Sequence, residues 1–140
     1  MLTPRATFES VGGFDSSTFF MYCDDVDYSW RTRLAGFRVV YAPAARVMHD
    51  KRLDATGAYQ PGEAEVYFSA EAAIMIAHKY SNPARVRSLI GRFRRQATEP
   101  VLRAVAEYES RRKANSLPTP LDPDHRVSSF VGDGYGRMRN

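Results

Sequence analysis

Two prolines, each at the start of a helical pattern, constrain the fold of this chain more than any other feature. Pro83 and Pro100 both follow short polar stretches and precede apolar residues at three- and four-residue spacing. Proline fits the first turn of a helix and is excluded from its interior, so each proline marks a new start. The sequence therefore predicts successive helices over residues 63–114, the first running from Glu63 to Tyr80.

The composition is that of a globular protein. The chain has 140 residues, of which 44% are hydrophobic and 26% charged. The single cysteine, Cys23, excludes a disulfide framework and a multi-cysteine zinc site. No apolar run reaches the roughly 20 residues that span a bilayer, and the N-terminal residues lack the layout of a signal peptide. The expected location is the cytoplasm, with contact at the inner face of the membrane left open.

The charge is unevenly distributed. Twenty Lys and Arg residues face 16 Asp and Glu residues, and residues 85–95 hold five arginines and no acid. These arginines are interpreted as a solvated helix face, with contact to anionic lipid headgroups as the alternative. No aromatic and basic stacking platform accompanies them, so nucleic acid is not expected as a partner. The cluster consists of Arg85, Arg87, Arg92, Arg94 and Arg95.

Composition divides the chain into four segments. Residues 1–50 combine a loop or strand end at 1–22, a short helix, and predicted strands at Phe37–Tyr41 and Arg46–His49. Residues 51–62 are rich in turn-forming residues and form a connector. Residues 63–114 are helical, and residues 115–140 are expected to be extended or disordered. The predicted class is α/β.

The short helix begins with a cluster of acids. Asp24, Asp25 and Asp27 occupy its first turn, where carboxylates favour the positive end of the helix dipole, and Gly36 ends it. By itself this cluster is the pattern of a well-capped helix start. A carboxylate there can also accept a proton from a hydroxyl, and His49, at the end of the second strand, is a candidate metal ligand. The helix's apolar stripe is Val26, Trp30 and Leu34.

Four motifs occur in a fixed order around this helix. They are VGGFD at 11–15, FFMYCDDVDYSWR at 19–31, AGFRVVYAP at 35–43 and VMH at 47–49. Together they resemble the C-terminal catalytic half of family 2 glycosyltransferases with the GT-A fold, the rhamnosyltransferase-like group in particular. The resemblance covers residues 5–49, about a third of the chain.

The resemblance implies a fold, a reaction and a site. The fold is an α/β C-terminal fragment of a GT-A nucleotide-diphospho-sugar transferase, followed by a helical extension. The reaction is inverting transfer of a sugar from a nucleotide sugar to a hydroxyl of a saccharide or lipid-linked acceptor, in envelope or surface polysaccharide synthesis. Asp24 and Asp25 match an acidic pair that contains the catalytic base, with Asp25 slightly favoured. His49 matches a histidine that helps bind a divalent cation, Mg or Mn.

In the resembling family a nucleotide-binding half precedes these motifs, and this sequence starts where that half would end. The chain alone is therefore expected to be inactive, to bind no cofactor and to lack affinity for nucleotide sugars. Predicted strands without neighbours expose backbone edges, which favours self-association. The alternative function is a non-catalytic module that binds a partner or a membrane surface through its basic amphipathic helices.

Overall fold

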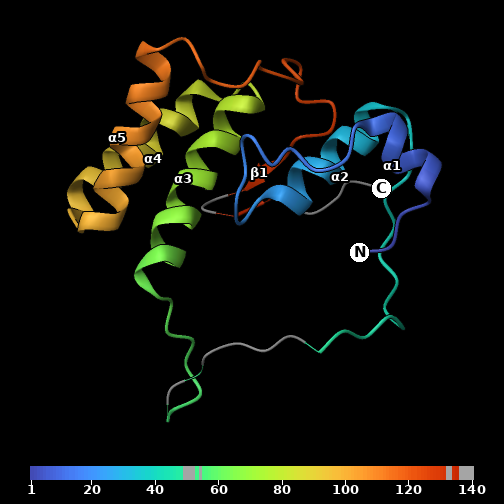
Figure 1. Cartoon of the computed structure of the whole chain (residues 1–140), viewed down its shortest axis with the longest axis horizontal. Helices are drawn as coiled ribbons and strands as arrows, with labels where there is room; N and C mark the ends of the chain where they lie inside the picture. Colours follow the sequence, from blue (N-terminus) through green and yellow to red (C-terminus); the bar gives the residue numbers. More distant parts are fainter. Residues whose placement is uncertain (49–52, 54, 132–133, 136–140) are drawn as a thin grey trace.

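The computed structural model describes residues 1–48, 53, 55–131 and 134–135. This part of the chain contains five helices and a small antiparallel hairpin (Figure 1). The helices are α1 (Arg5–Val11), α2 (Asp24–Leu34), α3 (Glu63–Lys79), α4 (Pro83–Gln96) and α5 (Glu99–Lys113). The hairpin pairs β1 (Phe130–Val131) with β2 (Gly134–Tyr135). The GT-A architecture stays a prediction, because these elements do not test it.

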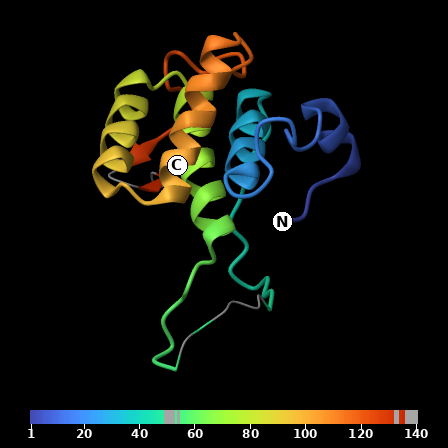
Figure 2. The same cartoon turned by 60° about the vertical axis from the view of Figure 1, so that its left-hand side comes forward.

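Helices α3, α4 and α5 pack against one another and form the larger part of the core, as Figures 1 and 2 show. The predicted starts are confirmed, since both prolines lie in the first turn of their helices. The Asn82 side chain caps α4 by accepting a hydrogen bond of 3.0 Å from the amide of Arg85. The middle of α3 is the most deeply buried stretch, with Ile74, Met75 and Ile76 at most 1% exposed.

Helix α2 confirms the predicted short helix and docks at the end of α3. After α2 the chain turns at Gly36, whose φ of +87° lies in the left-handed region. The Trp30 ring packs edge-on against Tyr80, with ring centroids 4.6 Å apart, and against Phe130 at 5.3 Å. This aromatic contact joins three segments that are far apart in the sequence.

Helix α1 was not predicted, because residues 1–22 were expected to be a loop or strand end. The Arg5 and Glu9 side chains form an i,i+4 ion pair of 2.7 Å, which favours a helical turn. Gly12, with a φ of +85°, ends the helix as a left-handed residue. Phe8 packs on the rings of Phe14 and Tyr28. These tertiary contacts stabilise a helix too short to show a periodic pattern.

The predicted strands at 37–41 and 46–49 do not appear in residues 37–48. A strand needs a neighbour that accepts and donates backbone hydrogen bonds, and no segment of the described chain pairs with these residues. His49, the end of the second predicted strand, lies outside the described residues. Several large apolar side chains of this stretch are exposed, among them Tyr41 at 82%, Val47 at 83% and Met48 at 99%.

Self-association is the expected consequence of this exposed stretch, because exposed apolar side chains leave water when two copies meet. Sedimentation velocity over a range of protein concentrations should show a concentration-dependent increase in sedimentation coefficient. Replacing Val47 and Met48 by serine should reduce that increase, while replacing the exposed Ser69 of α3 by alanine should not. A monodisperse monomer at high concentration would contradict the expectation.

The segment after α5 differs from the extended or disordered tail that was expected. Leu121 donates its amide to the Lys79 carbonyl at 2.6 Å, and its own carbonyl accepts from the Ser81 hydroxyl at 2.7 Å. The buried Asp122 carboxylate accepts three backbone amides, those of residues 126–128, at 2.7–3.0 Å. The apolar residues of this segment follow no periodicity, so no sequence pattern predicts that they pack on the core. These are Leu117, Leu121, Val127 and Phe130.

No helix in the described ranges combines the length and apolar composition needed to cross a bilayer.

Candidate functional site

The acidic pair follows two residues in the left-handed conformation. Tyr22 and Cys23 have φ angles of +67° and +60°, and Asp24 then begins α2. A non-glycine residue held there costs about 1–3 kcal/mol, and such residues cluster at functional sites. The Cys23 side chain is buried in the core, which holds the turn in place.

Asp24 and Asp25 differ in exposure. Asp24 is half-buried, whereas Asp25 is exposed and its Oδ1 accepts a 2.8 Å hydrogen bond from the amide of Val26. Over the described ranges, neither carboxylate forms an ion pair. The site therefore presents an exposed carboxylate at a helix N-terminus.

The third acid of the cluster, Asp27, has a different role. It is fully buried, and its Oδ1 lies 2.7 Å from Lys79 Nζ while its Oδ2 lies 2.8 Å from Arg31 Nε. The Tyr80 hydroxyl donates to Oδ1 and to the Asp27 carbonyl, both at 3.0 Å. Burial and the Asp27 charge raise the pKa of that hydroxyl above its usual range. Asp27 is thus a structural residue that fixes α2 to α3.

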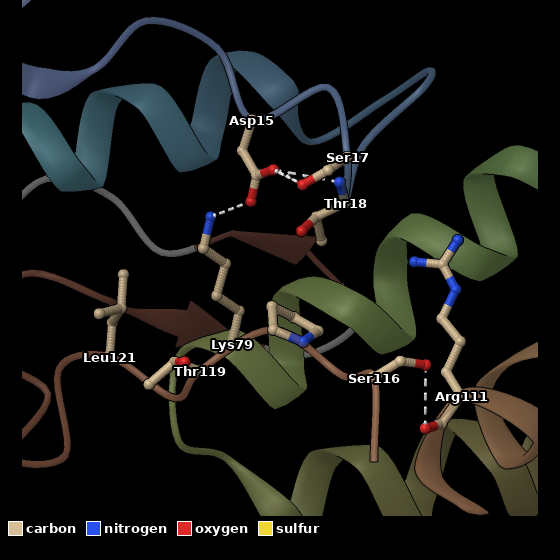
Figure 3. Close-up of a pocket in the computed structure, with 9 residues that line it drawn as sticks. Asp15, Ser17, Thr18, Lys79, Arg111, Ser116, Thr119 and Leu121 are labelled. Atoms are coloured by element: carbon tan, nitrogen blue, oxygen red, sulfur yellow. Dashed lines mark hydrogen bonds and ion pairs between the residues drawn. The ribbon is translucent and has the colours of Figure 1, made fainter. Parts of the chain in front are cut away.

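Lys79 also binds Asp15, so one ammonium connects two acids. Figure 3 shows Lys79 Nζ directed at the Asp15 carboxylate, 2.7 Å from Oδ2. Asp15 Oδ1 accepts from the Ser17 hydroxyl at 2.6 Å and from the Thr18 amide at 3.1 Å. A cavity of about 400 Å³ lies beside these groups, with Arg111 on its wall. We call Asp15, Asp27, Lys79 and Arg31 the buried charge network.

Arg31 extends the network to the glycine turn. Its Nη1 donates to the Val11 carbonyl at 2.8 Å and its Nη2 to the Gly13 carbonyl at 2.6 Å. These contacts give Arg31 a structural role. The turn that precedes the acidic pair is therefore fixed to the same helix that carries the pair.

Acid should destabilise this protein below about pH 4. Burial alone would raise the pKa of Asp15, but hydrogen bonds from Lys79, Ser17 and Thr18 outweigh it and hold the pKa well below its usual range. Burial opposes backbone hydrogen bonds in the same way at Asp122, whose pKa is also lowered. A lowered folded-state pKa gives stability that is present above the unfolded pKa, near 4, and is lost as pH falls toward the folded pKa.

Urea unfolding at about pH 6 and pH 3 measures this loss of stability. Asp15→Asn should lose less between the two values than the unchanged protein, because the variant has no carboxylate to protonate there. Exposed Asp124→Asn serves as the control and should leave the difference unchanged. Equal losses of stability for the unchanged protein and Asp15→Asn would contradict the lowered pKa assigned to Asp15.

The aromatic residues before the pair divide between the core and the surface. Phe19 is buried at 3% exposure and belongs to the core. Phe20 is 75% exposed and packs on Phe68, with ring centroids 4.8 Å apart. The Tyr22 hydroxyl lies 3.4 Å from that of Tyr59. Phe20 and Tyr22 thus remain on the surface, close in sequence to Asp24 and Asp25.

His78 and His125 each contact a hydroxyl group. His78 Nδ1 lies 3.4 Å from the Tyr108 hydroxyl, and His125 Nδ1 lies 3.0 Å from the Ser128 hydroxyl. His49, the proposed metal ligand, lies outside the described residues. Within the described ranges, no group of three or more His, Cys, Asp or Glu side chains is arranged to hold a metal ion.

The arginines of α4 are only in part a solvated face. Arg94 forms a 2.7 Å ion pair with Glu109 of α5, and Arg85 lies over the Phe130 ring at 5.1 Å. Arg87 and Arg95 are exposed.

With this geometry in place, sequence comparison relates a segment of the chain to glycosyltransferases. Over 51 residues it is 47% identical to the N-acetylglucosaminyl-diphospho-decaprenol L-rhamnosyltransferase of Mycobacterium tuberculosis, a match that covers 36% of this chain and 16% of the relative. Over 49 residues it is 45% identical to the rhamnosyltransferase WbbL of Escherichia coli K12, a match that covers 35% of this chain and 18% of that relative. The aligned part spans less than a fifth of either relative. No family model and no solved structure matches the chain.

Proposed function

We propose that this chain carries the acceptor-activating segment of an inverting glycosyltransferase of family 2 with the GT-A fold. The observation that carries the proposal is the 45–47% identity to rhamnosyltransferases over about 50 residues. The donor is a nucleotide sugar, and the acceptor is a hydroxyl of a saccharide or lipid-linked molecule. The mycobacterial relative is named for a lipid diphosphate, which favours an acceptor of that class in envelope polysaccharide synthesis.

In the proposed reaction, Asp25 is the general base. Its exposed carboxylate removes the proton from the acceptor hydroxyl, whose oxygen forms a bond to the anomeric carbon of the donor. The bond from that carbon to the nucleoside diphosphate breaks, its electron pair leaves with the diphosphate, and the configuration inverts. The half-buried Asp24 lies in the first turn of α2, where a negative charge stabilises the helix through its dipole.

A divalent cation, Mg or Mn, is implied by the resemblance, with His49 as a ligand. The described residues supply no group of three ligands for it, so they do not fit the metal by themselves.

A chimera tests the proposal directly. Residues 5–49 of this chain replace the corresponding segment of the E. coli relative, and a second chimera carries residues 5–81 so that Lys79 accompanies Asp27. Sugar transfer is followed as release of the nucleoside diphosphate. We expect at least the second chimera to transfer sugar at a rate within about tenfold of the parent, since the aligned residues are 45% identical. A folded second chimera that binds donor and transfers nothing would contradict the proposal.

A further inference from the structure

A second cavity, of about 570 Å³, lies between α4, α5 and the end of α3. Pro120, from the segment after α5, closes one side. Its volume falls within the range of small-molecule sites, about 300–1,000 Å³. No residue of α2 lines it, so it is separate from the acidic pair. Helix α4 contributes one face, through residues 83, 86, 87 and 90.

The wall of this cavity is apolar along α4. Val86 is buried and Ile90 half-buried, and Pro83 extends the same surface. His78 and Tyr108 line the cavity and contact each other at 3.4 Å. The wall suits a hydrocarbon chain, because apolar atoms that line it leave water when a chain covers them.

Two arginines lie at the same cavity. Arg87 of α4 and Arg112 of α5 line it, both are exposed, and no acidic residue lines it. Neighbouring arginines on the same helices have carboxylate partners: Arg94 pairs with Glu109, and Arg111 with Glu107 at 2.7 Å. Over the described ranges, neither Arg87 nor Arg112 has such a pair. Two unneutralised guanidinium groups beside an apolar wall form a site for an anion that carries an apolar group.

We propose that this cavity binds an anionic amphiphile, a phosphate ester with a hydrocarbon chain. The phosphate pairs with Arg87 and Arg112, and the chain lies along Val86 and Ile90. The same chemistry is found in a free alkyl phosphate and in a phospholipid headgroup, and the experiment separates these sources. The proposal does not depend on sugar transfer, because it uses no residue of the acidic pair.

Calorimetric titration of the full chain with octyl phosphate, below its micelle concentration, is the primary measurement. We expect saturable binding of one molecule per chain, and binding at least about tenfold weaker in the double variant Arg87→Gln/Arg112→Gln, because two charge-assisted contacts are lost. Arg95→Gln is the matched control, since Arg95 is exposed on α4 and does not line the cavity. Circular dichroism should show all variants folded.

Three further probes decide the chemistry. Octyl glucoside has the chain without the charge, and inorganic phosphate has the charge without the chain; both should bind at least about tenfold more weakly than octyl phosphate. Flotation with phosphatidylglycerol vesicles tests the membrane source. Vesicle binding that the double variant loses and Arg95→Gln retains identifies a headgroup, whereas octyl phosphate binding without vesicle binding identifies a free ligand.

The proposal is overturned by any of four results. These are absence of octyl phosphate binding, equal binding of octyl glucoside or inorganic phosphate, an equal loss in Arg95→Gln, and binding to vesicles alone.

Discussion

Asp27→Ala is expected to lower the free energy of unfolding by about 3–5 kcal/mol, the usual cost of removing one partner of a buried ion pair. Asp27 is fully buried, and its carboxylate lies within 3.0 Å of Lys79, Arg31 and Tyr80. Lys79 keeps Asp15 as a partner, but it loses half of its buried countercharge. The total free energy of unfolding of a typical domain is about 5–15 kcal/mol, so the variant should be close to unfolding.

Urea denaturation followed by Trp30 fluorescence measures this effect, because the single tryptophan is buried beside Tyr80. Asp25→Ala, two residues earlier in the same helix and exposed, should cost about 1 kcal/mol or less. The double variant Asp27→Leu/Lys79→Met should recover only part of the loss, because it leaves Asp15 without Lys79 and Arg31 without a carboxylate. A loss below about 1 kcal/mol for Asp27→Ala would contradict the structural role given to this residue.

Asp25→Asn in the sugar-transferring chimera is expected to lower turnover by about 10²–10⁴-fold, the scale for loss of a general base. The amide is close in size to the carboxylate but does not accept the hydroxyl proton. Donor binding should change little, because Asp25 is proposed to contact the acceptor. Turnover and donor affinity are measured separately, by nucleoside diphosphate release and by calorimetric titration of the donor.

Asp24→Asn is the matched comparison at the adjacent position. It should cost at most about 1 kcal/mol of stability and leave most of the turnover, because Asn removes only a charge that favours the N-terminal end of the helix dipole. Glu9→Gln, in the exposed Arg5–Glu9 pair of α1, controls for loss of a surface charge. If turnover survived both Asp24→Asn and Asp25→Asn, the catalytic assignment of the pair would be wrong.

Sequence alone predicted α2 to α5 because their signals are local. Prolines, a glycine stop and three- to four-residue apolar spacing each act within a few turns of helix. Helix α1 was missed because its stability comes from Phe8 against Phe14 and Tyr28, contacts that no periodicity reveals. The expected strands failed for the same kind of reason, since a strand depends on a partner that the strand's own residues do not specify.

The sequence predicts the local part of the candidate site and misses its long-range contacts. Asp24 and Asp25 are adjacent in the chain, so their proximity needed no fold. In the sequence, Asp27 looks like a third member of the same cluster. Its partner Lys79 lies 52 residues further along the chain (79 minus 27), and no local pattern predicts a contact over that separation. One local signal was present: Asp27 and Arg31 stand four residues apart on one helix face, as ion pairs do.

The buried charge network has a consequence for the stretch between α2 and α3. Contacts of Lys79 and Tyr80 with Asp27 hold α2 against the end of α3. Loop closure entropy grows slowly, by about 0.6 kcal/mol for each doubling of loop length. The exposed residues 55–58, which lie outside the proposed catalytic segment 5–49, should therefore accept inserted peptides or a reporter domain.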